Sequence, residues 1–263
     1  MNEVTRVSSI FWQEQNKLLG EHQDFENFKN WKEVKEIPLY KPDDSFTFLY
    51  SQDNYELIQF SDYKKEWLEV IKLGEDKKGH TEESWNDAMG FEFYDYQTSL
   101  WIMKAFHHML TFEHVMEKSI LDYKHIVEFG AGIGETAKMI FNRGYKGSYS
   151  IVDLPNVARI SKYYLSDHDV SWIETKDIEY KPDTLFIALW SLSEVAFEDR
   201  YPVADKIQGM DQLILFSNEI LGMMNKEYFT YSWPILTNTF IRLRNMWFHP
   251  SDGGNNYLIA RGA

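Results

Sequence analysis

The segment that decides the fold is residues 126–135, IVEFGAGIGE. It joins a short apolar run to three glycines, Gly130, Gly132 and Gly134, and a helix-forming stretch, 136–142, follows. Glycines at alternate positions allow a sharp turn and let a ligand approach the backbone without a Cβ in the way. The helix that follows offers free N–H groups at the same turn. The segment therefore predicts a strand, a ligand-binding turn and a helix.

The chain around this segment alternates between β-rich runs and helical stretches. The expected strands are 125–129, 149–152, 170–173, 185–190, 213–216, 240–248 and 257–260. Strand–helix alternation predicts an α/β fold with a doubly wound, mostly parallel seven-stranded sheet. A turn-rich linker, 250–255, precedes the last run, so we expect a closing hairpin with an antiparallel last strand.

The first 120 residues have a different character. Apolar and aromatic residues recur at helical spacing over 9–37, 54–73 and 96–120. We therefore predict a mainly helical N-terminal region, 1–120, that covers the ligand site as a lid or acceptor pocket. The ligand-binding domain is expected over 121–263.

Composition narrows the classes of partner. The 263-residue chain has a formal net charge of −14, and a surface this acidic repels nucleic acids and anionic membranes. It contains no cysteine, which excludes disulfides, thiolate-bound zinc and cysteine nucleophiles. The first ten residues lack the features of a signal peptide, and no apolar stretch approaches the length of a membrane span. We expect a cytoplasmic protein that acts on a small molecule.

Acidic residues stand at the ends of the first two expected strands. Glu128 precedes Gly130 by two residues, where a carboxylate suits an ammonium-bearing ligand and disfavours a pyrophosphate. The glycine spacing is G-x-G-x-G, whereas dinucleotide-binding turns have G-x-G-x-x-G. Asp153 ends the second strand, where a carboxylate can accept hydrogen bonds from both hydroxyls of a ribose. These residues predict a ligand that contains a nucleoside.

Two further polar segments follow the third and fourth strands. Asp177 lies in a turn where it can meet an exocyclic amine, and residues 190–194, WSLSE, follow the fourth strand. Ligands of doubly wound sheets bind at the carboxyl ends of the strands, and all four segments stand there. Simpler roles stay open: Asp153 as a helix cap, Asp177 as a loop acid and Glu194 as a capping or surface acid.

The string from Glu128 to Glu135, followed by residues 152–155, VDLP, resembles class I S-adenosylmethionine (SAM)-dependent methyltransferases. The wider pattern is similar to the bacterial sugar O-methyltransferase family, through residues 191–194, SLSE, and 257–259, YLI, preceded by His249 and glycines. The resemblance covers residues 120–263.

The resemblance implies a role for each matching residue. Glu128 and the backbone of Gly130, Gly132 and Gly134 would hold the methionine part of SAM. Asp153 would hold the ribose, Leu154 would pack on the adenosine and Asp177 would contact the adenine. Trp190 and Ser191 would lie beside the sulfonium. One feature departs from the plant-type enzymes, whose base is the His of a His-Asp pair after the fourth strand, because this chain has Ser193 and Glu194 there.

A hydroxyl acceptor benefits from a general base, and histidine suits near-neutral pH. His249 is the first candidate, since it begins the loop after the sixth strand, and Glu194 is the second. A surface-loop role for His249 stays open. Arg242 and Arg244 alternate along the sixth strand and can bind an anionic acceptor or form salt bridges at a sheet edge. No His/Asp cluster has the spacing of metal ligands, so no metal is predicted.

The leading hypothesis is SAM-dependent methylation of a sugar hydroxyl, with a nucleotide-linked or surface-polysaccharide sugar as acceptor and S-adenosylhomocysteine (SAH) as product. One alternative is a non-sugar acceptor, such as a phosphoryl or phosphoramidate oxygen or a secondary metabolite. Another class is a nicotinamide-dependent oxidoreductase, which the glycine spacing disfavours. A third is a SAM-binding protein without catalysis, which the missing His keeps open.

Overall fold

The computed structural model describes the C-terminal part of the chain most fully. The described residues are 13, 17, 57–59, 97–99, 105, 108–109, 111–113, 115–132, 134–220, 222–233, 240–244 and 255–262. Only the backbone is described for residues 57–59, 97–99, 160, 240–244 and 255.

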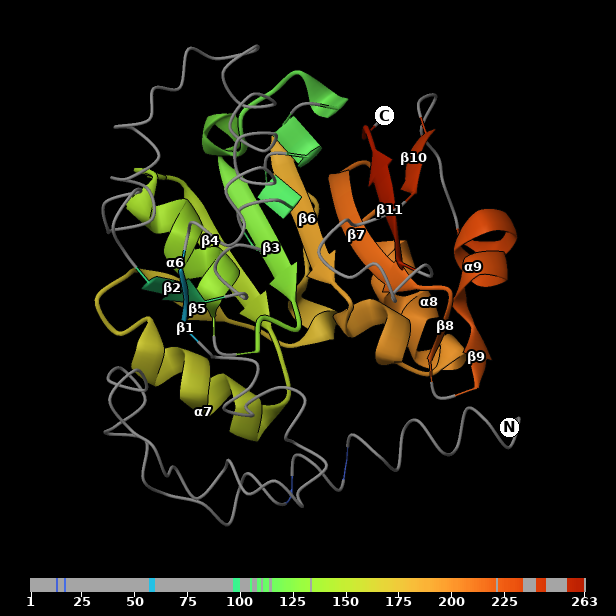
Figure 1. Ribbon diagram of the computed structural model, residues 1–263, viewed down its shortest axis with the longest axis horizontal. Helices are drawn as coiled ribbons and strands as arrows, with labels where there is room; N and C mark the ends of the chain where they lie inside the picture. Colours follow the sequence, from blue (N-terminus) through green and yellow to red (C-terminus); the bar gives the residue numbers. More distant parts are fainter. Residues whose placement is uncertain are drawn as a thin grey trace.

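A seven-stranded sheet forms the centre of the described fold (Figure 1). Its strands, in spatial order, are β10 (Phe240–Arg244), β11 (Asn255–Ala260), β7 (Asp211–Ser217), β6 (Thr184–Leu189), β3 (His125–Phe129), β4 (Ser148–Val152) and β5 (Val170–Trp172). The five strands from β7 to β5 are parallel, and β11 is antiparallel to both β7 and β10. The predicted doubly wound sheet and its closing antiparallel strand are confirmed.

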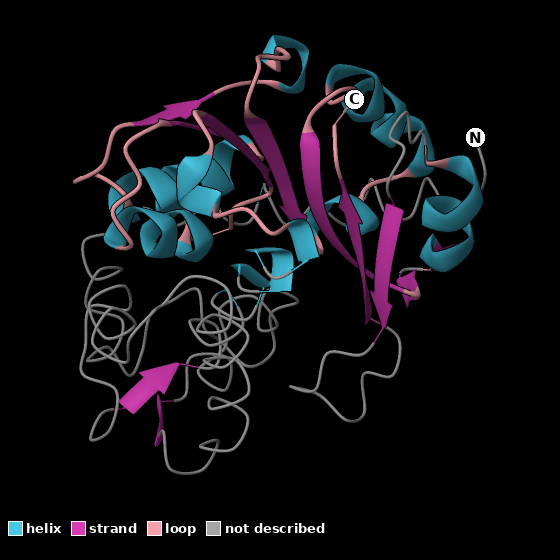
Figure 2. Cartoon of the chain, turned by 90° about the horizontal axis from the view of Figure 1, so that it is seen from above, coloured by secondary structure: helices cyan, strands magenta, loops and turns pink. Residues whose placement is uncertain are grey.

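Helices and short turns connect the strands. They are α6 (Glu135–Asn142), α7 (Pro155–Tyr164), η6 (Thr175–Asp177), η7 (Ser191–Glu194), α8 (Phe197–Lys206), α9 (Asn225–Glu227) and η8 (Tyr228–Ser232), with η5 (Ile120–Asp122) before the sheet. Two short strands, β8 (Glu219–Ile220) and β9 (Met223–Met224), pair antiparallel in a separate sheet. Pro155 occupies the first turn of α7, where its missing N–H costs nothing. Seen from above, helices lie on both sides of the sheet (Figure 2).

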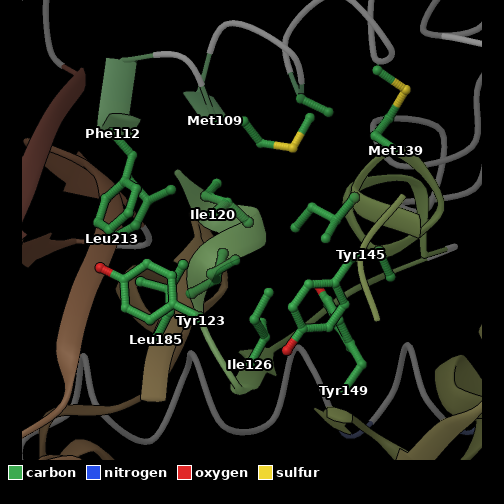
Figure 3. Packing of buried hydrophobic residues seen from close by; sticks show 14 of the residues in the cluster. Met109, Phe112, Ile120, Tyr123, Ile126, Met139, Tyr145, Tyr149, Leu185 and Leu213 are labelled. Carbon is green, nitrogen blue, oxygen red and sulfur yellow. The ribbon is translucent and has the colours of Figure 1, made fainter. Parts of the chain in front are cut away.

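Strand alternation separates two apolar cores, one on each face of the sheet. Leu185 and Ile187 of β6 belong to one cluster, and Phe186 and Ala188 belong to the other. The first cluster is covered by α6 and by the helical residues between 105 and 116 (Figure 3). The second is covered by α8 and η8. The central strands are apolar on both faces, as expected of a sheet that is covered on both sides.

The helical residues between 105 and 116 are fastened to the sheet domain by polar contacts. Glu113 forms a buried ion pair with Arg143, with Nη2 and Oε2 3.0 Å apart. Glu113 also accepts hydrogen bonds from Ser119 Oγ and Ile120 N, both at 2.8 Å. Arg261 Nη2 donates to the carbonyl of Met116 at 2.9 Å. This part of the N-terminal region is therefore built into the core of the sheet domain.

Two short strands lie where helical spacing predicted helix. β1 (Leu57–Gln59) falls within 54–73 and pairs antiparallel with β2 (Gln97–Ser99), which falls within 96–120. For these residues the helical prediction was wrong. Antiparallel pairing satisfies the backbone groups of two segments far apart in sequence, and local periodicity cannot reveal such a partner. Within the described residues, no helix is long and apolar enough to cross a membrane.

The buried Glu113–Arg143 pair gives a prediction about stability. Replacing Arg143 by Met leaves the Glu113 carboxylate buried without its cation, and we expect a loss of about 3 kcal/mol in the free energy of unfolding. Urea unfolding measures it. The double variant Arg143→Met/Glu113→Gln removes the uncompensated charge and should lose less. A double variant as unstable as Arg143→Met would contradict the argument.

Candidate functional site

The glycine turn after β3 lies at the carboxyl edge of the parallel strands. All three glycines adopt positive φ angles, +71° at Gly130, +59° at Gly132 and +94° at Gly134, which side chains disfavour. Gly130 N donates to Val152 O of β4 at 2.8 Å, and Gly134 N donates to Ala131 O at 2.9 Å. The sequence IVEFGAGIGE thus forms the predicted strand, turn and helix.

Gly130 and Gly132 serve different purposes. A Cβ at Gly130 would overlap Ser191 of η7, whose hydroxyl donates to Phe129 O. Among the described residues, no atom lies within 4 Å of a Cβ added at Gly132. The first glycine lets two loops touch, and the second leaves open space over the crest of the turn, where a ligand can approach the backbone.

Asp153 holds the glycine turn in place. Its Oδ2 accepts from Gly132 N at 3.0 Å and its Oδ1 from Leu154 N at 2.7 Å. Burial raises the pKa of Asp153 to about 7, while hydrogen bonds from the backbone of Leu154, Gly132 and Ala131 oppose the rise. The N-cap of α7 is Leu154, so the simple helix-cap role does not describe Asp153, which joins the end of β4 to the turn.

Glu128 is a buried carboxyl directly before the turn, with an exposed fraction of 2%. Tyr149 Oη donates to its Oε2 at 2.8 Å. Burial raises the pKa of Glu128 to about 7, and the nearby charge of Asp153 raises it further. Hydrogen bonds from Tyr149 and Thr136 lower the pKa and partly offset this rise. Glu128 and Asp153 thus form a pair of interacting acids beneath the glycine turn.

The loop after β6 brings a third acid to the same edge. Trp190 has a φ of 62°, a strained value for an aromatic residue. Its backbone is held on both sides, since its N–H donates to Leu215 O at 2.8 Å and its carbonyl accepts from Ser193 N at 2.8 Å and Ser193 Oγ at 2.5 Å. Glu194 follows at the end of η7, and burial raises its pKa to about 8. A carboxyl with this pKa can exchange a proton near neutral pH.

The remaining predicted residues lie at or near this edge. Leu154 is half-buried beside Asp153, and Asp177 is exposed at the end of η6, after β5. His249 lies outside the described residues. β10 runs parallel to β7, because both are antiparallel to β11, so β10 ends at Arg244 on the predicted edge. The backbone of Arg242 and Arg244 is described, and their side chains lie outside the description.

The sequence alone did not single out His108 as a site residue. His108 is 1% exposed and lies edge-on to Trp190, with ring centroids 5.2 Å apart. Its Nδ1 is hydrogen-bonded to Tyr257 Oη at 2.6 Å. Burial raises the pKa of Tyr257, so the hydroxyl keeps its proton. The helical register alone could have indicated that His108 shares the face of Phe112, but not that this face meets Trp190.

Sequence reasoning also missed Glu135, the first residue of α6. It is 8% exposed, and among the described residues its Oε1 has no hydrogen-bond partner. Burial raises the pKa of Glu135 to about 8. An acid directly after the third glycine was the available signal, but only the fold shows its burial. Across the described part of the chain, no group of three His, Cys, Asp or Glu side chains is arranged to hold a metal ion.

No family model and no curated protein sequence matches the chain. Solved structures do resemble it. A structure described as "PigF with SAH" has a TM-score of 0.42 at 12% identity, over 74% of this chain and 69% of that one. The methyltransferase domain of bacterial CtHen1 has a TM-score of 0.47 at 10% identity, over 61% and 99%. An rRNA methylase from Streptococcus thermophilus has a TM-score of 0.41 at 12% identity, over 54% and 89%. Because these TM-scores are all below 0.5 and the identities are low, we infer function from the residues of the site.

The two glycines give a matched pair of variants. Gly130→Ala places a Cβ against Ser191 and should destabilise the protein by about 3 kcal/mol. Gly132→Ala meets no atom of the described residues within 4 Å and should cost about 1 kcal/mol, from the positive φ alone. Thermal and urea unfolding compare the two. Equal losses would show that the turn does not press against η7 as described.

The four buried acids predict how stability without ligand depends on pH. Glu128, Asp153, Glu135 and Glu194 have pKa values raised to about 7, 7, 8 and 8 by burial, from ordinary values of 4.5, 3.8, 4.5 and 4.5. Between about pH 4 and 8 the native state therefore holds protons that the unfolded chain has released, so the free energy of unfolding should fall as pH rises. Glu135→Gln should weaken this fall. A wild-type stability that rises between pH 5 and 8 would contradict the argument.

Proposed function

We propose that the chain is a SAM-dependent methyltransferase that acts on an oxygen atom. The observation that carries the proposal is the crest of the glycine turn at Gly132, where no described atom lies within 4 Å of an added Cβ. The Gly132 N–H donates to Asp153, whose charge interacts with Glu128. This arrangement lies at the carboxyl ends of β3 and β4, where ligands of doubly wound sheets bind.

The charges of the site fit a cation. Glu128 is buried and Asp153 is half-buried, and each has a pKa raised because the protein around it limits solvation of its charge. A ligand with an ammonium and a sulfonium group compensates such charges, whereas a pyrophosphate is repelled by them. In the proposal, Glu128 and the turn hold the methionine part, Asp153 and Leu154 hold the adenosine, and Asp177 contacts the adenine.

The strand order argues against a nicotinamide enzyme. In the dinucleotide-binding order, the sixth strand lies beside the fifth and continues the parallel sheet. Here β11 lies between β7 and β10 and runs antiparallel to both. The glycine spacing and the acids at the turn also disfavour a pyrophosphate-containing cofactor. Neither the sheet nor the turn therefore supports the oxidoreductase alternative.

The chain's own residues supply positioning and proton transfer. When bound, SAM would supply an electrophilic methyl group, so that an acceptor oxygen bonds to the methyl carbon as the carbon–sulfur bond breaks and SAH leaves. Trp190 is half-buried at the end of β6 and Ser191 is fixed against the glycine turn, so both would border the reacting centre. Glu194, with its raised pKa, is the described residue best suited to take the proton from an acceptor hydroxyl. His249 remains a second candidate base.

The acceptor is proposed from chemistry and resemblance. A sugar hydroxyl is our first choice, because the sequence resembles sugar O-methyltransferases and a hydroxyl needs a base such as Glu194. The net charge of −14 disfavours nucleic acid. An anionic acceptor, such as a phosphoryl oxygen, would require Arg242 and Arg244. We further propose that region 1–120 covers the acceptor and that the enzyme acts in the cytoplasm.

Calorimetric titration with SAM, SAH and NADH tests the cofactor. We expect SAM and SAH to bind and NADH not to bind. Asp153→Asn should weaken SAH binding at least about tenfold, since an amide nitrogen cannot accept hydrogen bonds from the turn and a ribose. Asp183→Asn changes a half-exposed acid that pairs with Lys124 and serves as the matched control. Binding of NADH alone would contradict the proposal, and so would an equal loss of SAH affinity in Asp153→Asn and Asp183→Asn.

The affinity for SAH should also depend on pH. Protonation of Glu128 and Asp153 removes the charges that attract the ligand's ammonium group, and their pKa values are about 7. We therefore expect weaker binding at pH 6 than at pH 8, with protons released on binding below pH 7. Titrations in buffers of different ionisation enthalpy measure the release. An affinity that is flat from pH 6 to 8 would contradict the assigned role of these acids.

A further inference from the structure

Arg200 of α8 is a buried cation outside the proposed cofactor contacts. It is 0% exposed, and its guanidinium carbon lies 4.7 Å from the ring centroid of Phe197, 4.9 Å from that of Tyr228 and 5.2 Å from that of Phe229. Burial lowers its pKa to about 10. Within the described part of the chain its polar partners are uncharged. A charge buried without a counter-ion is costly, so its contacts point to a role beyond ion pairing.

The hydrogen bonds of Arg200 converge on the backbone around Glu194. Nε donates to the carbonyl of Val195 at 2.7 Å, and Nη2 donates to the carbonyl of Ser193 at 2.8 Å. One planar guanidinium therefore binds the carbonyls on both sides of Glu194. The backbone that carries the Glu194 side chain is thus fixed before and after that residue.

Asn225 of α9 completes the arrangement. Its Oδ1 accepts from Arg200 Nη2 at 2.8 Å, and its Nδ2 donates to the carbonyl of Ser193 at 3.0 Å. The Ser193 carbonyl thus receives two donors from two different helices. Asn225 is itself fully buried, with an exposed fraction of 0%. It orients the guanidinium and binds the same loop, so the two residues act as one clamp.

We propose that Arg200 and Asn225 are positioning residues that hold the Glu194 carboxyl in place to accept a proton from the acceptor. This inference rests on the proposed function, because it assumes that Glu194 is the base. The fixed fork of a guanidinium can bind two carbonyls at once, which the single ammonium of lysine cannot do in the same geometry. Trp190, directly before η7, has a strained backbone, and such strain persists only where surrounding contacts hold it.

The ionisation of Glu194 reports whether the clamp holds. The charged group that contacts its loop from α8 is Arg200, and Tyr228 of η8 lies behind the guanidinium, with its own pKa raised to about 12 by burial. Neither changes charge between pH 5 and 9. If the clamp is loosened, water reaches the Glu194 carboxyl and its pKa should fall from about 8 toward the ordinary value of 4.5.

The test measures the pKa of Glu194 by carboxyl carbon NMR, with the resonance assigned through Glu194→Gln. We expect a lowered pKa in Arg200→Lys and in Asn225→Leu, and SAH affinity within about threefold of wild type in both. Gln212→Leu is the matched control. It removes a buried side chain that accepts from Trp233 Nε1 at 3.1 Å, near the amino end of β7, and should lower the melting temperature without moving the Glu194 pKa.

The outcomes separate the inference from the proposed function. If Arg200→Lys and Asn225→Leu lower the melting temperature as Gln212→Leu does, and the Glu194 pKa stays near 8, the clamp is only structural and the inference is overturned. Where Arg200→Lys does not fold, Asn225→Leu carries the same comparison. A wild-type protein that fails to bind SAM and SAH overturns the proposed function instead, whatever the NMR titration shows.

Discussion

The site depends on one close contact between two loops that belong to different strands. Gly130 after β3 and Ser191 after β6 touch so closely that a Cβ at position 130 has no room. The Ser191 hydroxyl then binds Phe129 O, at the end of the neighbouring strand. This contact joins the glycine turn, with its acids Glu128 and Asp153, to the loop that carries Glu194. Without it, the cofactor side and the acceptor side of the proposed site would be independent loops.

The second constraint is that charged groups inside the protein need partners, and this fold provides them in two ways. Arg143 is buried with a carboxylate partner, Glu113, and the pair fastens the N-terminal helical residues to the domain. Around the proposed cofactor site, acids such as Glu128 and Asp153 are buried with hydrogen bonds from neutral donors instead. The first arrangement is complete within the protein. In the proposed function, the second would be completed by the ammonium group of the ligand.

The sequence predicted the sheet well because its signals are local. Each strand is a short apolar run, and IVEFGAGIGE carries its strand, turn and helix within ten residues. The contacts that complete the site are not local. His108 meets Trp190 across the fold, and Arg200 reaches Ser193 from another helix. No spacing rule indicates such contacts, because they depend on how elements pack. The short β1–β2 pair was not predicted for the same reason, because its two strands are far apart in the sequence.

Asp153 shows how a residue can hold the fold and a ligand together. Its two oxygens accept from Leu154 N and Gly132 N, and the backbone of Ala131 donates to the same carboxylate. A carboxylate, however, has about four acceptor positions. With three backbone donors bound, about one position remains, and it can receive a hydroxyl of a ribose without releasing the turn. In the proposed function, the same side chain would shape the turn before binding and contact the ligand after it, so that binding would need little reorganisation.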